Sequence, residues 1–139
     1  MRIHGWLLLF CFLALTQYSV GAETPRIFHA SPDSLQNARA DSVECILQSG
    51  DLQIRKVSIF IRNDRWEMFR ERPMEYRSGR YVYDIDPETA TGQYLLYFIL
   101  VEFGDYSVVA SPAESPEKQP HRVPLVSHVK KMNNPAESR

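Results

Sequence analysis

Two carboxylates spaced two residues apart are the first candidates for chemistry in this sequence. Asp84 and Asp86 would share one face of a strand, and Glu88 follows closely. Hard cations such as calcium bind several oxygen ligands of this kind. The same residues fit a solvated strand face that ends in an Asp-Pro turn, which is the more ordinary interpretation. We therefore predict no metal site here.

Histidines and serines give no stronger indication of catalysis. A nucleophile needs a base within hydrogen-bond reach, and in a sequence only a motif indicates such a pair. The sequence contains no Gly-x-Ser-x-Gly elbow, no histidine pair at zinc spacing and no glycine-rich phosphate loop. His29 precedes a turn, and His121 and His128 lie in a proline-rich segment. We predict no catalytic residue, no cofactor and no enzymatic activity, and a small hydrolase is only the third hypothesis.

Aromatic side chains between residues 66 and 76 suggest another role. Trp66, Phe69 and Tyr76 offer rings of the kind on which sugars stack. In β-rich proteins such rings more often pack in the core or at an edge. A carbohydrate-binding accessory domain that uses Trp66 and Tyr76 is therefore the second hypothesis for function.

The elements that would position these residues are short strands. Apolar and polar residues alternate repeatedly along the chain, and turn residues interrupt the alternation about every ten residues. Pro73 marks an edge or a bend, and Gly104-Asp105 indicates a hairpin turn. This pattern predicts an all-β, antiparallel sandwich of about seven strands. The expected strands are 27–30, 43–48, 57–62, 66–76, 81–85, 94–103 and 106–110.

A family resemblance rests on the order of several short motifs. They are Ile27-x-His29-x-x-Pro32, Val57–Arg62, Pro73-Met74, Gly79-Arg80-Tyr81, Ile85-Asp86-Pro87, Thr91-Gly92, Leu95–Ile99 and Gly104. In this order they resemble bacterial immunoglobulin-like domains of the fibronectin type III kind, over roughly residues 26–112. The resemblance implies an immunoglobulin-like sandwich in a secreted or cell-surface protein. It also implies a binding or spacer module more than an enzyme, because this fold hosts unrelated functions.

The longest apolar run, Tyr94–Phe103, departs from the pattern of a sandwich strand. Such a strand places one face on the core and the other toward solvent. Both faces are apolar here, and Phe60 points outward from the strand 57–62, which is a neighbour in immunoglobulin-like sandwiches. The core set is Leu95, Tyr97, Ile99 and Val101, and the candidate binding face is Phe60, Leu96, Phe98 and Leu100.

An apolar patch of this kind is usually covered or used for binding. One covering is the chain's own segment 111–129, through Val123, Leu125 and Val126. The other is a protein partner, a second copy of the chain or a neighbouring domain. A register slip of one residue would exchange the two strand faces and remove the patch.

The first 22 residues have the pattern of a secretory signal. Trp6–Leu15 is an apolar run too short to span a bilayer, and Val20-Gly21-Ala22 fits a cleavage site. We expect a signal peptide over 1–22, a domain over 23–112 and a proline-rich polar tail over 113–139, with no transmembrane segment after cleavage. The tail prolines are expected to preclude further central strands: Pro112, Pro116, Pro120 and Pro124.

Composition narrows the function further. The 139 residues include 16 Lys+Arg and 17 Asp+Glu, and this near-neutral balance argues against nucleic acid as a partner. Loss of Cys11 with the signal would leave Cys45 alone, so no internal disulfide is expected and Cys45 is predicted to be a buried thiol. The sequence thus predicts an exported, secreted or periplasmic, non-enzymatic interaction or spacer module of the cell envelope that binds a protein partner.

Overall fold

The computed structural model describes residue 21 and residues 23–128, and every regular element within them is a β-strand. The all-β prediction is therefore confirmed for this part of the chain. Apart from Gly21, the expected signal segment 1–22 lies outside the described residues, as does 129–139 of the expected tail. No helix suited to crossing a membrane is found among the described residues.

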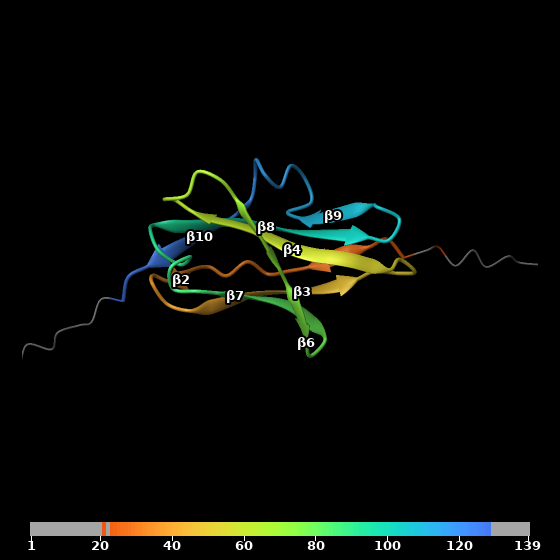
Figure 1. Ribbon diagram of the computed structural model, residues 1–139, viewed down its shortest axis with the longest axis horizontal. Coiled ribbons are helices and arrows are strands. Elements are labelled where there is room, and N and C mark those ends of the chain that lie inside the picture. The colour runs from red at the N-terminus through yellow and green to blue at the C-terminus, as the bar shows by residue number, and fades with distance from the viewer. Residues whose placement is uncertain (1–20, 22, 129–139) are drawn as a thin grey trace, which may run out of the picture.

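Ten strands form two sheets that face each other across a common core (Figure 1). One sheet has the order β1-β3-β7-β6, and the other has the order β2-β10-β8-β4-β5, with β9 also pairing with β8. Neighbours are antiparallel, except that β10 and β2 run parallel. The strands are β1 (Arg26–Phe28), β2 (Leu35–Gln36), β3 (Asp41–Gln48), β4 (Ile54–Asn63), β5 (Arg70–Pro73), β6 (Glu75–Arg77), β7 (Arg80–Ile85), β8 (Tyr94–Phe103), β9 (Val108–Ser111) and β10 (His121–Val126).

Period-two alternation builds the core as the sequence predicts. Every second residue of β4 and β8 faces inward, because successive strand side chains point to opposite faces of a sheet. Cys45 on β3 packs in the same core with a free thiol, and burial raises the pKa of that thiol to about 11. The fully buried members from β4 and β8 include Ile59, Ile61, Leu95, Tyr97, Ile99 and Val101.

The chain changes sheets between β5 and β6. β5 lies at the edge of the larger sheet and ends at Pro73, where the missing N–H interrupts no ladder. Met74 is buried, and its N–H donates to the Val57 carbonyl at 3.0 Å. Glu75 then begins β6 in the smaller sheet, so this segment passes across one side of the two sheets (Figure 1). Pro73 thus marks both an edge and a bend, as predicted.

The prediction that the tail prolines preclude further central strands is wrong. β10 lies between β8 and β2, and Pro124 is inside it, opposite Tyr94. The Leu125 N–H points toward β8 and donates to the Gln93 carbonyl at 2.8 Å. The Pro124 nitrogen therefore points to the other side, where β2 pairs only with Leu125 and Val126. A proline is tolerated because no donor is needed at this position.

The strand number also exceeds the predicted seven, for identifiable reasons. β2 and β10 are additional strands that pair with each other. The stretch predicted as one strand over 66–76 is divided by the sheet change into β5 and β6. The sequence-based domain limit at residue 112 falls between β9 and β10, so a strand of the larger sheet lies in the segment expected to be a tail.

Candidate functional site

The outer face of the larger sheet brings the predicted binding residues together. Phe60 on β4 and Leu96, Phe98 and Leu100 on β8 all alternate with core residues, so they point away from the core. Phe60 and Phe98 are register partners, and their rings stack with centroids 4.7 Å apart and planes 3° from parallel. The four side chains therefore form one apolar stripe across two neighbouring strands.

The chain itself covers the centre of this stripe. Phe98 is only 2% exposed, whereas Phe60, Leu96 and Leu100 are half-buried. The ring of Phe69, from the loop between β4 and β5, meets Phe98 edge-on at 5.2 Å. The sequence indicated Phe69 only as an aromatic residue, because no local pattern shows which strand a loop residue will cover.

A groove remains beside this covered centre. Its volume is about 250 Å³, and its walls are Phe98 and Leu100 of β8 and the turn Ser115–Lys118. The N–H groups of Lys118 and Gln119 both donate to the Ser115 carbonyl at 2.9 Å, which fixes the turn. The segment between β9 and β10 thus shapes one wall of an open apolar groove on the outer face.

The tail residues expected to cover the patch lie elsewhere. Val123 and Leu125 are buried on the inner side of β10 and belong to the core between the sheets. Val126 is 39% exposed at the end of the strand. The expectation that these three residues cover the outer face is wrong, because β10 joins the sheet beside β8, which turns Val123 and Leu125 toward the core and leaves Val126 at the end of the strand.

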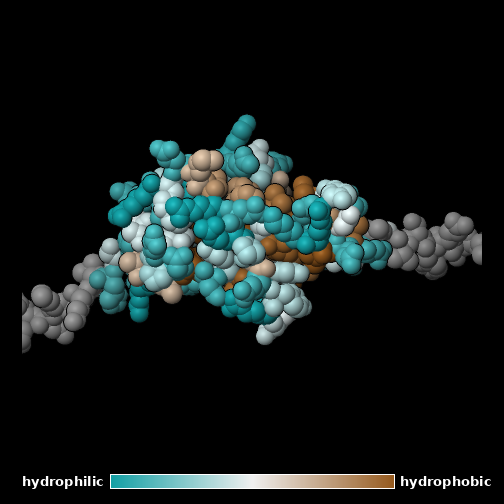
Figure 2. All heavy atoms as spheres, viewed as in Figure 1, coloured by the Kyte–Doolittle hydropathy of each residue, from teal (hydrophilic) through white to brown (hydrophobic). Residues whose placement is uncertain are grey.

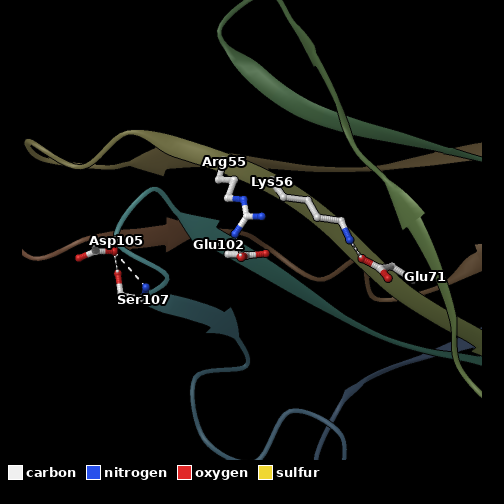
Figure 3. Close-up of polar contacts among 6 residues, drawn as sticks. All are labelled: Arg55, Lys56, Glu71, Glu102, Asp105 and Ser107. Atoms are coloured by element: carbon white, nitrogen blue, oxygen red, sulfur yellow. Dashed lines mark hydrogen bonds and ion pairs between the residues drawn. The ribbon is translucent and has the colours of Figure 1, made fainter.

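Ion pairs neutralise one end of the outer face (Figure 3). Arg55 contacts Glu102 at 2.7 Å, and Lys56 pairs with Glu71. The hydrogen bond from Lys56 holds the pKa of the Glu71 carboxyl below its ordinary value. Asp105, in the predicted hairpin turn between β8 and β9, accepts two hydrogen bonds from its own turn. Cations at this end are thus matched by carboxylates of the same chain.

Arginines near the opposite end of the sheet pack on aromatic rings without a carboxylate partner among the described residues, whereas Arg55 at the first end has both Glu102 and the Tyr106 ring, whose centre lies 4.8 Å from its guanidinium carbon. Arg62 of β4 and Arg122 of β10 are the register partners of Leu96 on its two sides, and both point outward. Arg70 is the register partner of core-facing Ile61, so on the edge strand β5 it points to the opposite side of the sheet from Arg62 and Arg122. The three pairs are Arg122 over Tyr94 (3.7 Å from the guanidinium carbon to the ring centre), Arg70 over Trp66 (3.5 Å) and Arg62 over Phe69 (5.2 Å).

The two aromatic residues predicted for sugar binding are not brought together. Trp66 follows β4, where its N–H donates to the Asn63 side chain at 3.1 Å, and Arg70 occupies one face of its ring. Tyr76 is 66% exposed on β6 in the other sheet, beside Tyr81. A sugar platform needs open ring faces on one surface, and this pair does not provide it.

A histidine cluster that the sequence did not reveal ties the two sheets together. His29, just after β1, contacts the Glu44 carbonyl through Nδ1 and the Tyr97 hydroxyl through Nε2, both at 2.7 Å. The His121 ring lies 5.0 Å from the His29 ring, and its Nε2 is 3.1 Å from the Ser111 hydroxyl. Burial and the neighbouring His29 lower the pKa of His121, and burial raises the pKa of Tyr97 to about 12.

The Ser111–His121 contact has the donor and acceptor of a nucleophile–base pair but lacks the other parts of a catalytic site. A catalytic pair needs a third group that orients the base and a cleft that admits substrate. The His121 ring is flanked by His29 and Tyr97, and neither supplies a carboxylate. The groove beside Phe98 is not lined by Ser111 or His121. The cluster therefore fits a structural role at the junction of the two sheets.

The acidic residues considered for calcium are engaged separately. Asp84 binds Arg77 at 2.6 Å, and Asp86 accepts hydrogen bonds from the Thr89 N–H and hydroxyl, both at 2.8 Å. The backbone hydrogen bond from Thr89 holds the pKa of Asp86 below its ordinary value. Within the described part of the chain, no group of three or more potential metal ligands is found.

Comparison with known proteins assigns no family to the chain. No family model matches the chain, and no curated protein matches it.

The outer face of the larger sheet combines an apolar stripe, a groove and unevenly distributed charge, and this combination is suited to non-covalent recognition.

Proposed function

We propose that the chain is an exported, non-enzymatic interaction module of the cell envelope, built as an immunoglobulin-like sandwich of the fibronectin type III kind. The single observation that carries the proposal is the groove that Phe98 and Leu100 form with the turn Ser115–Lys118. A protein side chain entering it would contact Leu100, which is half-buried and outward-facing. Apolar area lost from water stabilises such a contact by about 25 cal/mol per Å².

Several observations support the choice of a protein partner over the alternatives. Apolar side chains gather around the β8–β9 end of the molecule (Figure 2), where Val108 is also 57% exposed. Protein interfaces combine such an apolar centre with a polar rim. The separation of Trp66 from Tyr76, and the arginine on one ring, leave no observation that favours a carbohydrate platform. The Ser111–His121 pair lies outside the groove, which leaves no observation in favour of a hydrolase.

Site-specific photo-cross-linking in the native host tests this proposal. A photoreactive phenylalanine analogue is placed at Leu100, and separately at Ile46, which is 50% exposed on the outer face of the other sheet. We expect one discrete protein adduct from position 100 and none of that size from position 46. An equal adduct pattern at both positions, or no protein adduct at position 100, would contradict the proposal.

Export is tested in the same cells. We expect the processed chain to begin near residue 23 and to be found outside the cytoplasm, because residues 1–22 have the pattern of a secretory signal. N-terminal sequencing of the purified chain and fractionation of the cells measure both properties. An unprocessed chain that stays in the cytoplasm would overturn this part of the proposal.

A further inference from the structure

The charge on the outer face of the larger sheet is arranged asymmetrically along the strands. At the β8–β9 end, Arg55 and Lys56 are paired with Glu102 and Glu71 (Figure 3). At the other end, Arg62 and Arg122 form no ion pair with any carboxylate that the structure describes. The whole chain has a formal net charge of −1, so this cationic end is a local feature and not an effect of composition.

Stacking prepares these guanidinium groups for an anion. A guanidinium that lies flat on a ring keeps its N–H donors in the plane of the group, where they point away from the ring. The ring also restricts the side chain before any ligand arrives, so less conformational entropy is lost on binding. Arg122 is exposed, and its guanidinium carbon lies 3.7 Å from the centre of the Tyr94 ring. Arg62 is half-buried, lies 5.2 Å from the centre of the Phe69 ring, and also donates a hydrogen bond to the Trp66 carbonyl at 3.1 Å.

Arg62 and Arg122 bracket an apolar residue. They flank Leu96 on the strands to either side, so their Cα atoms are separated by two strand spacings, or about 10 Å. Leu96 is half-buried and continues the stripe that leads through Phe98 to Leu100 and the groove. A ligand that follows this surface meets cations at one end and apolar side chains along the rest.

We propose that the partner of this face is an acidic polypeptide segment that carries both carboxylates and apolar side chains. Its carboxylates would accept hydrogen bonds from Arg62 and Arg122, and its apolar side chains would lie along Leu96 and Leu100. Carboxylates are the anions that suit this surface, since bidentate guanidinium–carboxylate pairs combine strength with fixed geometry. This inference rests on the proposed function and adds the chemistry of the partner.

An acidic polysaccharide is the competing ligand, and two observations disfavour it. A polysaccharide has no aliphatic side chains to place in the groove beside Phe98 and Leu100. Its rings would also need an open aromatic face, whereas Arg70 lies 3.5 Å from the centre of the Trp66 ring and Arg122 lies 3.7 Å from that of Tyr94.

Selection from a library of random 12-residue peptides displayed on phage tests the proposal on the folded full chain. We expect the enriched peptides to contain at least two Asp or Glu residues together with Leu, Ile, Val or Phe. The most enriched peptide is then synthesised with a fluorophore, and its binding is measured by fluorescence anisotropy. A second peptide with every Asp and Glu replaced by Asn and Gln serves as its neutral partner.

Two double variants, one at each end of the face, assign the binding to one end. Arg62→Gln with Arg122→Gln is expected to weaken binding of the acidic peptide by about tenfold or more, since charge-assisted hydrogen bonds are the stronger class. Arg55→Gln with Glu102→Gln alters the paired end and is expected to change binding by less than about twofold. Circular dichroism confirms that both variants are folded before the comparison is made.

The outcomes separate this inference from the function on which it rests. If neutral apolar peptides are enriched and Leu100→Asp abolishes their binding, the apolar face binds protein but the acidic partner is wrong. If no peptide depends on Leu100, the proposed function itself fails. If polygalacturonate binds through Arg62 and Arg122 without dependence on Leu96 or Leu100, the partner is a polysaccharide and the inference is overturned.

Discussion

At the scale of single residues, Gly92 occupies a position that only glycine suits. Its φ of +120° is a conformation that side-chain-bearing residues rarely adopt, and an added Cβ would lie 1.9 Å from Asp64 Oδ1. The same oxygen accepts the Gln93 N–H at 2.9 Å, and this hydrogen bond lowers the pKa of Asp64. Gly92 and Asp64 thus fix the approach of the chain to β8.

Substitution of Gly92 by alanine tests this tight contact. We expect Gly92→Ala to lower the free energy of unfolding by about 2–3 kcal/mol, because backbone strain and a steric clash coincide. Gly79→Ala is the control: its φ is +85°, but nothing lies within 4 Å of the added Cβ, so we expect a loss of about 1 kcal/mol. Urea denaturation monitored by fluorescence measures both. Equal losses would show that the Asp64 contact contributes nothing.

At the scale of elements, β10 is the feature whose role differs most from its sequence pattern. Val123 is fully buried on the core side of this strand, whereas Val126 is 39% exposed three residues later. We expect Val123→Ala to cost about 2 kcal/mol of unfolding free energy and Val126→Ala less than about 0.5 kcal/mol. Equilibrium denaturation compares the two variants. Similar losses in both would contradict the placement of β10 in the sheet.

A strand was predictable from the sequence when the residues that determine its position lie within the strand itself. β4 and β8 were predicted with their core faces, because alternation within one strand decides which residues are inside. β10 was not predicted, because Pro124 inside it, Pro120 directly before it and its polar residues outweigh the two buried residues Val123 and Leu125. Its place depends on pairing with β8, which lies far away in the sequence.

The candidate binding face was predictable only as a set of residues on one side. The common face of Phe60, Leu96, Phe98 and Leu100 follows from strand parity and from adjacency of the two strands. Their exposure does not, because the covering ring of Phe69 comes from a loop. The arginine–aromatic pairs were also missed, since they depend on the path of the loop between β4 and β5 and on the pairing of β10 with β8.

At the scale of the whole molecule, the histidine cluster couples pH to folding. It joins β1, β8, β9 and β10 through His29, Tyr97, Ser111 and His121. Because the folded state lowers the pKa of His121 below its ordinary value of 6.5, the unfolded chain binds the proton more readily. This contribution to stability is therefore fully present above pH 6.5 and is lost as the pH falls below that value and through the lower pKa of the folded state.

Measurement of unfolding free energy between pH 7.5 and pH 5 tests this coupling. We expect stability to decline over this range, and His121→Gln, which keeps a polar group near Ser111, to flatten the decline. Tyr97 stays neutral throughout, since its pKa is raised to about 12. His128→Gln changes an exposed histidine and is expected to leave the decline unchanged. An equal slope in wild type and His121→Gln would contradict the role of His121.

The two ends of the described chain have a mechanical consequence. β1 and β10 belong to different sheets, and the chain enters β1 and leaves β10 at opposite ends of the molecule (Figure 1). Tension applied to the two ends would act along these strands and load the β1–β3 and β10–β8 ladders in shear. Several hydrogen bonds would then share the load at once, instead of opening one after another as in a zipper. A module that is anchored on one side and holds a partner on the other would resist extension for this reason.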